Sequence, residues 1–137
     1  MKSYFVDSNV FLRFITRDDA DQSIIAERLF LQAKAGEIEL FCGPPVFFEV
    51  AWVLRAVYKL ENAAILDILE SMLSIPNLAV SDADSVTRAI AMARRQSLGF
   101  ADSYIAVTAL GKNIGVATFN RAHFEKTGAV WYPFDKG

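Results

Sequence analysis

Short apolar runs alternate with segments of helical periodicity along almost the whole chain, and this alternation restricts the fold more than any other feature. The runs at residues 4–6, 38–42, 78–80, 115–119 and 128–132 predict strands. Helices are predicted between them, over about 8–15, 21–36, 45–59, 62–73, 84–95, 100–113 and 121–126. Strands that alternate with helices predict an α/β fold, a three-layer α/β/α sandwich with a mostly parallel sheet and right-handed crossovers.

The length of 137 residues predicts a single domain over 1–137, with enough chain to bury a substantial core. A hydrophobic fraction of 53% with 22% charged residues excludes disorder on composition. No stretch is both long and apolar enough to cross a bilayer, and Asp7 interrupts the N-terminus before a secretory apolar region develops. We therefore expect a cytoplasmic protein. The single cysteine, Cys42, is predicted to be a small buried hydrophobe.

The net charge of −2 argues mildly against a protein that coats nucleic acid, because binding to phosphates without sequence preference needs a positive surface. It does not argue against a nuclease. A carboxylate cluster that binds a metal lowers the net charge without describing the rest of the surface.

The first strand ends in the polar cluster Asp7, Ser8 and Asn9, after which helical spacing resumes. In open α/β sheets, ligands bind beyond the carboxyl ends of the strands. We therefore interpret Asp7 as a metal ligand. Three later segments bring polar side chains that the topology would direct to the same edge.

The first of these segments is the apolar helix at 45–59, which contains Glu49. An ionised carboxylate without a partner in apolar surroundings would cost several kcal/mol or change its protonation state. Taken alone, Glu49 is better explained by pairing with Arg55, or by exposure to water near the helix start, than by metal binding. The abundance of apolar side chains on this helix predicts a dimer through it and part of the following helix, or a groove filled by a partner segment. These side chains include Phe47, Phe48, Trp52 and Tyr58.

The other two segments carry Asp102, in the first turn of a late helix after Gly99, and Asn120, directly after the strand at 115–119. A carboxylate in a first turn is stabilised by backbone N–H groups whether or not it does chemistry. If the strands at 4–6 and 115–119 are parallel neighbours, Asp7 and Asn120 converge. The lone histidine, His123, is interpreted as a surface or half-buried residue rather than a catalytic base.

These stretches together resemble a PIN domain, and specifically a VapC-type toxin ribonuclease of a toxin-antitoxin system, over essentially the whole chain. The resemblance rests on residues 5–10 (FVDSNV), on Glu49 in an apolar helix after Pro44 and Pro45, on residues 100–103 (FADS), and on residues 117–121 (ATFNR). It implies a Mg²⁺- or Mn²⁺-dependent endoribonuclease that forms a homodimer and is inhibited by a cognate antitoxin. The family commonly has Asp where this chain has Asn120, and an amide brings no charge.

The resemblance also implies roles for particular residues. Asp7 and Asp102 would bind the metal directly, Glu49 directly or through water, and Asn120 through its carbonyl oxygen or a water that it orients. Ser8, Asn9 and Thr118 would support these ligands. The candidates for contact with the RNA backbone are Arg13, Arg17, Arg94, Arg95, Lys112 and Arg121. Because Asn120 is neutral, a second metal should bind more weakly than the first.

Three alternatives stay open at this stage. A phosphatase of the haloacid-dehalogenase type needs a second acid two positions after the first, and that residue is Asn9 here. A phosphoacceptor receiver domain needs an acidic pair after its first strand and a lysine after its fifth, and neither is present. A PIN-like binding module with a weakened or inactive site would fit the neutral Asn120.

Overall fold

The computed structural model describes residues 1–134 and divides the chain into two compact units, one from Met1 to Ala83 and one from Asp84 onwards. The first unit contains a three-stranded parallel sheet of order β1-β2-β3. The strands are β1 (Lys2–Phe5), β2 (Ile38–Cys42) and β3 (Leu78–Val80). The predicted fold class, an α/β sandwich with a mostly parallel sheet, is confirmed.

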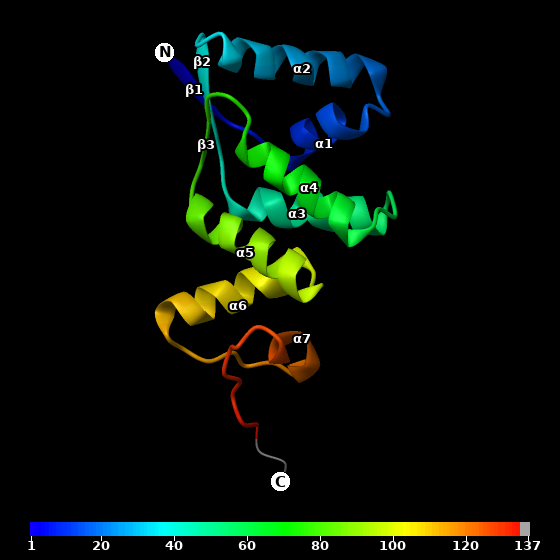
Figure 1. The fold of residues 1–137 in the computed structure, drawn as a ribbon. Helices are drawn as coiled ribbons and strands as arrows, with labels where there is room; N and C mark the ends of the chain where they lie inside the picture. Colours follow the sequence, from blue (N-terminus) through cyan, green and yellow to red (C-terminus); the bar gives the residue numbers. More distant parts are fainter. Residues whose placement is uncertain (135–137) are drawn as a thin grey trace. The chain divides into compact units, whose positions relative to one another are not determined.

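Four helices complete the first unit: α1 (Ser8–Thr16), α2 (Ala20–Lys34), α3 (Pro44–Ala56) and α4 (Asn62–Leu73). Figure 1 shows them to one side of the three strands. Here α1 packs against α2 and α3, and α3 packs against α4. The core of the first unit contains the fully buried Phe11, Leu40, Phe47, Leu54 and Leu69.

Local sequence explains where these helices begin and end. The Asp19 carboxylate accepts a hydrogen bond from the Gln22 backbone N–H at 3.0 Å and so caps α2. Proline occupies the first positions of α3, where a missing N–H costs nothing. Gly36 follows α2 with a φ of 79°, a left-handed conformation that glycine adopts without strain.

The second unit contains α5 (Ala83–Gln96, which begins at the boundary), α6 (Phe100–Lys112) and α7 (Arg121–Glu125). Two of the predicted strands are wrong. Segments 115–119 and 128–132 form an isolated parallel bridge between Val116 and Trp131 instead of strands. Beneath this bridge lies a small core of Val116, Phe124 and Ala129 with Ala106 and Ala109 of α6.

No helix in the described part of the chain is both long and apolar enough to span a membrane.

The expected burial of α3 holds only in part. Val50 and Leu54 are buried, but Trp52 is 66% exposed.

Candidate functional site

Asp7 lies at the carboxyl edge of the sheet. The β1 ladder extends to Val6, whose backbone N–H donates to the Phe41 carbonyl at 2.8 Å, and the chain then enters α1. Asp7 is the residue before the helix, with φ −77° and ψ 155°, but its side chain makes no capping bond. The carboxylate is exposed and its Oδ2 accepts a hydrogen bond from Asn9 Nδ2 at 3.2 Å. An ionised carboxylate offers about four lone-pair positions, so this contact leaves others for a ligand.

Glu49 lies in the helix that follows the neighbouring strand. Because Phe5 and Phe41 are register partners in parallel strands, β1 and β2 end at the same edge of the sheet. The turn from β2 into α3 passes through Gly43, where an added Cβ would lie 2.5 Å from Ser81 Oγ, so only glycine fits without a shift. The chain thus leaves this edge twice, once through Asp7 into α1 and once into α3, which carries Glu49.

The expectation that Glu49 sits in apolar surroundings is wrong, because the residue is exposed. Its suggested partner, Arg55, donates instead to Asn62 Oδ1 at 2.8 Å. Of the two structural explanations for Glu49, exposure to water is therefore the one that the structure supports.

Asp102 and His123 are in contact in the second unit. Asp102 lies in the first turn of α6, and its Oδ2 is 2.8 Å from His123 Nδ1 in α7. An ionised carboxylate only accepts hydrogen bonds, so Nδ1 carries the proton of this contact. The Asp102 side chain is 32% exposed and that of His123 57%. Sequence reasoning placed His123 at the surface and missed its contact with a candidate ligand, since the two residues are far apart in the chain.

Asn120 precedes α7 and is held by local hydrogen bonds. Its backbone N–H donates to Thr118 Oγ1 at 2.9 Å, and its carbonyl accepts from the His123 backbone N–H at 3.0 Å. Thr118 therefore supports the backbone of Asn120. One short turn of chain connects Asn120 to His123, and His123 reaches Asp102.

A buried serine follows each of the two aspartates. Ser8 and Ser103 are fully buried, and within residues 1–134 neither hydroxyl has a hydrogen-bond partner. A buried hydroxyl without a partner costs about 1–3 kcal/mol. Each hydroxyl follows one of the two carboxylates in the sequence, and an unused hydroxyl there fits a site in which oxygen atoms bind a hard cation.

The described residues contain no group of three or more His, Cys, Asp or Glu side chains arranged to hold a metal ion. Asp7 and Glu49 belong to the first unit and Asp102 and Asn120 to the second. The four-residue metal site therefore stays a prediction.

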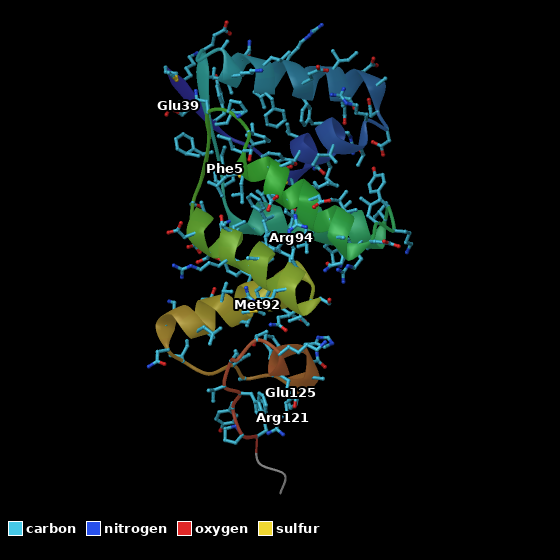
Figure 2. All side chains as sticks on the ribbon, in the orientation of Figure 1. Phe5, Glu39, Met92, Arg94, Arg121 and Glu125 are labelled. Carbon is cyan, nitrogen blue, oxygen red and sulfur yellow. The ribbon has the colours of Figure 1, made fainter. Side chains whose placement is uncertain are left out.

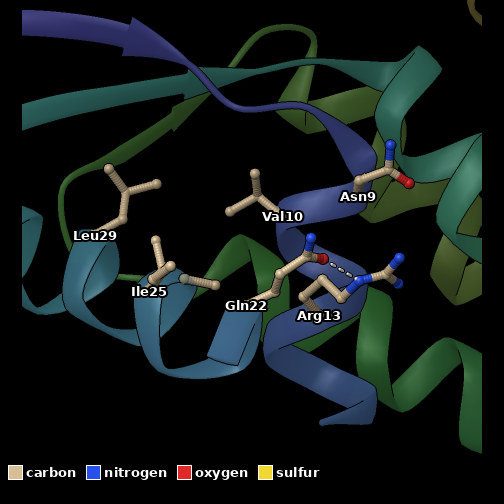
Figure 3. Close-up of a pocket in the computed structure, with 7 residues that line it drawn as sticks. Asn9, Val10, Arg13, Gln22, Ile25 and Leu29 are labelled. Atoms are coloured by element: carbon tan, nitrogen blue, oxygen red, sulfur yellow. Dashed lines mark hydrogen bonds between the residues drawn. The ribbon is translucent and has the colours of Figure 1, made fainter. Parts of the chain in front are cut away.

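A pocket of about 450 Å³ lies between α1 and α2 (Figure 3). Val10, Ile25, Ala26 and Leu29 form its apolar wall, and Asn9, Arg13 and Gln22 form its polar end. Arg13 Nε donates to Gln22 Oε1 at 2.6 Å. Asn9 borders this pocket and also contacts Asp7, so the two features are adjacent.

Some of the candidate RNA-contacting cations have intramolecular partners. Arg17 forms an ion pair with Glu27 at 3.3 Å and lies over the Phe14 ring. The Arg95 guanidinium lies 3.7 Å from Met92 Sδ. Arg94 and Lys112 are exposed. Arg121 lies over the Trp131 ring, with 5.3 Å between its Cζ and the ring centroid.

The fold and these positions define a class: an α/β protein with a parallel sheet and an acidic residue at the carboxyl end of its first strand. The family model of the PIN domain matches residues 4–130, across both units. The chain belongs to the PIN domain family.

A comparison with solved structures finds a similar chain in the crystal structure of VapBC2 from Rickettsia felis bound to a DNA fragment from their promoter. The two chains are 18% identical, the match covers 97% of this chain and 99% of that one, and the TM-score is 0.39. Among curated protein sequences, none matches.

Proposed function

We propose that the protein is a Mg²⁺- or Mn²⁺-dependent endoribonuclease, the toxin of a VapBC-type toxin-antitoxin pair. The observation that carries this proposal is the family match over residues 4–130, which includes all four candidate site positions. The exposed Asp7 carboxylate at the sheet edge and the half-buried Asp102 support it, because both retain free oxygen atoms.

In this proposal Asp7 and Asp102 bind the cation directly, Glu49 binds it directly or through water, and Asn120 contributes its side-chain carbonyl oxygen. The bound cation would lower the pKa of a water molecule and stabilise charge on the scissile phosphate. With Asn120 neutral, the site holds fewer charges than one with a fourth acid, which favours a single cation.

Neighbouring residues hold the ligands in this proposal. Asn9 donates to Asp7, and His123 donates to Asp102. Each of these contacts fixes one carboxylate oxygen and leaves the other for the cation. Thr118 fixes the backbone of Asn120. The Ser8 and Ser103 hydroxyls, which have no hydrogen-bond partner within residues 1–134, would each be available to a group bound beside the neighbouring aspartate.

The proposed partners are RNA, a cognate antitoxin and a second copy of the chain. The pocket between α1 and α2 has the apolar wall that a side chain of an antitoxin segment would need, and Arg13 and Gln22 at its polar end could pair with that segment's backbone or carboxylates. On α3, the exposed Trp52 supports the proposed homodimer contact, because large aromatic side chains are enriched at interfaces.

The test is cleavage of a structured RNA by the purified protein in Mn²⁺, with and without chelator. We expect cleavage that the chelator abolishes and that Asp102→Asn lowers at least about 100-fold. Asp84→Asn is the matched control, since Asp84 also lies in the first turn of a helix of the second unit. Equal loss in both variants, or cleavage that persists in chelator, would contradict the proposal.

The neutral Asn120 favours a second candidate, a PIN-like binding module with an inactive site. The two candidates differ in metal binding. An inactive module should show no Mn²⁺-dependent rise in melting temperature beyond that of a variant carrying both Asp7→Ala and Asp102→Ala.

A further inference from the structure

An exposed group of aromatic rings borders Asn120. The Phe119 and Phe134 rings stack with 4.6 Å between centroids and an interplanar angle of 19°, and Tyr132 meets Phe134 edge-on at 5.0 Å. Phe119 is 88% exposed, and Tyr132 and Phe134 are also exposed. We call Phe119, Tyr132 and Phe134 the aromatic surface.

Backbone pairing holds these rings together. Val116 N–H donates to the Val130 carbonyl and Tyr132 N–H donates to the Val116 carbonyl, both at 2.7 Å. At Gly115 an added Cβ would lie 3.0 Å from the Val130 carbonyl oxygen, so glycine permits the close approach. The segments that carry Phe119 and Phe134 therefore run side by side above the small core of the second unit, and the rings are arranged before any ligand binds.

The geometry of Phe119 suits a flat ligand. One face of its ring lies against Phe134, and an exposure of 88% leaves the other face open to solvent. Thr118 Oγ1 accepts the Asn120 N–H and fixes the turn that presents the ring. An aromatic ring has few rotatable bonds, so stacking a second flat ring on it costs little conformational entropy.

A positive charge lies two residues further along the chain. Arg121 is the first residue of α7, and its guanidinium lies over the Trp131 ring (Figure 2). A nucleotide has a flat base and a negative phosphate, so an exposed ring and a cation two residues apart in the chain suit its two parts. Bases stack on aromatic side chains in proteins that bind single strands, and arginine contacts their phosphates.

We propose that Phe119 stacks an unpaired nucleobase of a single-stranded RNA and that Arg121 contacts its phosphate. The occupant is RNA rather than a second copy of the chain, because the cation and the open ring adjoin Asn120 of the candidate site. This inference rests on the proposed function for its substrate class. It adds a binding position that neighbours Asn120 in the chain and is distinct from the metal ligands.

The test measures binding in the Asp102→Asn background, where cleavage does not remove the ligand. The probe is a fluorescently labelled single-stranded oligoribonucleotide of mixed sequence, and the readout is fluorescence anisotropy. We expect Phe119→Ala to weaken binding about 10-fold or more, since one base stacked on an aromatic side chain commonly contributes that much. Phe119→Trp should keep the affinity. Val130→Ala is the matched control, because it removes an exposed apolar side chain from the segment that carries Tyr132 and Phe134 without removing a ring.

Two further measurements separate stacking from charge and from other occupants. Arg121→Gln should reduce the slope of log affinity against log salt concentration by about 1, as the loss of one phosphate contact does. A fully paired duplex of the same sequence should bind with no dependence on Phe119, because its bases are not free to stack.

Unchanged affinity in Phe119→Ala, with a melting temperature equal to the parent's, would overturn the inference. So would an equal loss with the duplex, or a change in oligomeric state without a change in RNA affinity, which would identify a protein interface. The experiment also distinguishes failure of this inference from failure of the proposed function. If RNA binding depends on Phe119 but the unmodified protein does not cleave RNA, the proposed function is wrong and this inference holds.

Discussion

Removal of the His123 imidazole should weaken metal binding without unfolding the protein. Its Nδ1 lies 2.8 Å from Asp102 Oδ2 and fixes one oxygen of a proposed ligand. In metal sites, loss of a partner that orients a ligand typically lowers metal affinity 10- to 100-fold. Both side chains are partly exposed, at 57% and 32%, so water can replace the lost donor. We therefore expect the lower end of that range, about 10-fold or about 1.4 kcal/mol, for His123→Phe.

The assay is a calorimetric titration of the full-length protein with Mn²⁺, compared with His123→Phe and His123→Asn. Phenylalanine keeps the size and flat shape of the ring, whereas asparagine keeps an N–H donor on a shorter side chain, so His123→Asn should recover part of the affinity. In the Asp102→Asn background the His123→Phe substitution should have almost no further effect, because the two residues act through one contact.

Two results would refute this reasoning. One is an unchanged Mn²⁺ affinity in His123→Phe. The other is a loss that persists in full when Asp102 is already replaced, since that would assign the effect to something other than the contact between the two residues. Thermal unfolding without metal provides the control for structural damage.

Three further predictions concern stability and reactivity. The hydrogen bond from Tyr58, followed by that from Thr16, lowers the pKa of Asp18 below its ordinary value of 3.8, so this stabilisation is present above that pH and is lost as the pH falls through the lower folded value. Melting curves should therefore show Tyr58→Phe as destabilising at neutral pH, and its effect should shrink as the pH falls below 3.8. Burial raises the pKa of the Cys42 thiol to about 11. A disulfide reagent at pH 8 should therefore label Cys42 in the native protein only as fast as the structure opens locally, and at once in denaturant. Fast labelling of the native protein would count against the burial of Cys42. Asp19→Ala should lower the free energy of unfolding by about 1 kcal/mol through the loss of a helix cap, measured in urea, whereas Asp7→Ala should not, because the Asp7 side chain caps nothing.

Strong local signals explain which parts of the fold could be predicted. The first three strands and all the predicted helices occur in the structure within a few residues, because each carries an apolar run, a proline or glycine boundary, or an acidic first turn. Segments 115–119 and 128–132 also read as strands, yet only one parallel bridge forms between them. The apolar composition of the two segments could not reveal that they come close at one point only, where Gly115 lies against the Val130 carbonyl.

The candidate site was predictable only in part. The positions of Asp7 after a strand and of Asp102 in a first turn followed from the sequence and agree with the structure. The surroundings of Glu49 did not, because the density of apolar residues on a helix does not say which of its faces is covered. Contact between Asp102 and His123 depends on the packing of α6 against α7, and no local pattern encodes it.

An aspartate at the start of a helix has an ordinary explanation, and the structure separates the residues to which it applies from those to which it does not. Asp19 and Asp7 occupy the same position before a helix, but only the Asp19 carboxylate bonds to a backbone N–H of its helix. Asp7 bonds to Asn9 instead, and Asp102 to His123. Because neither of the last two carboxylates bonds to the nearest helix end, capping does not explain why the chain places them there, whereas the proposed binding of a cation would.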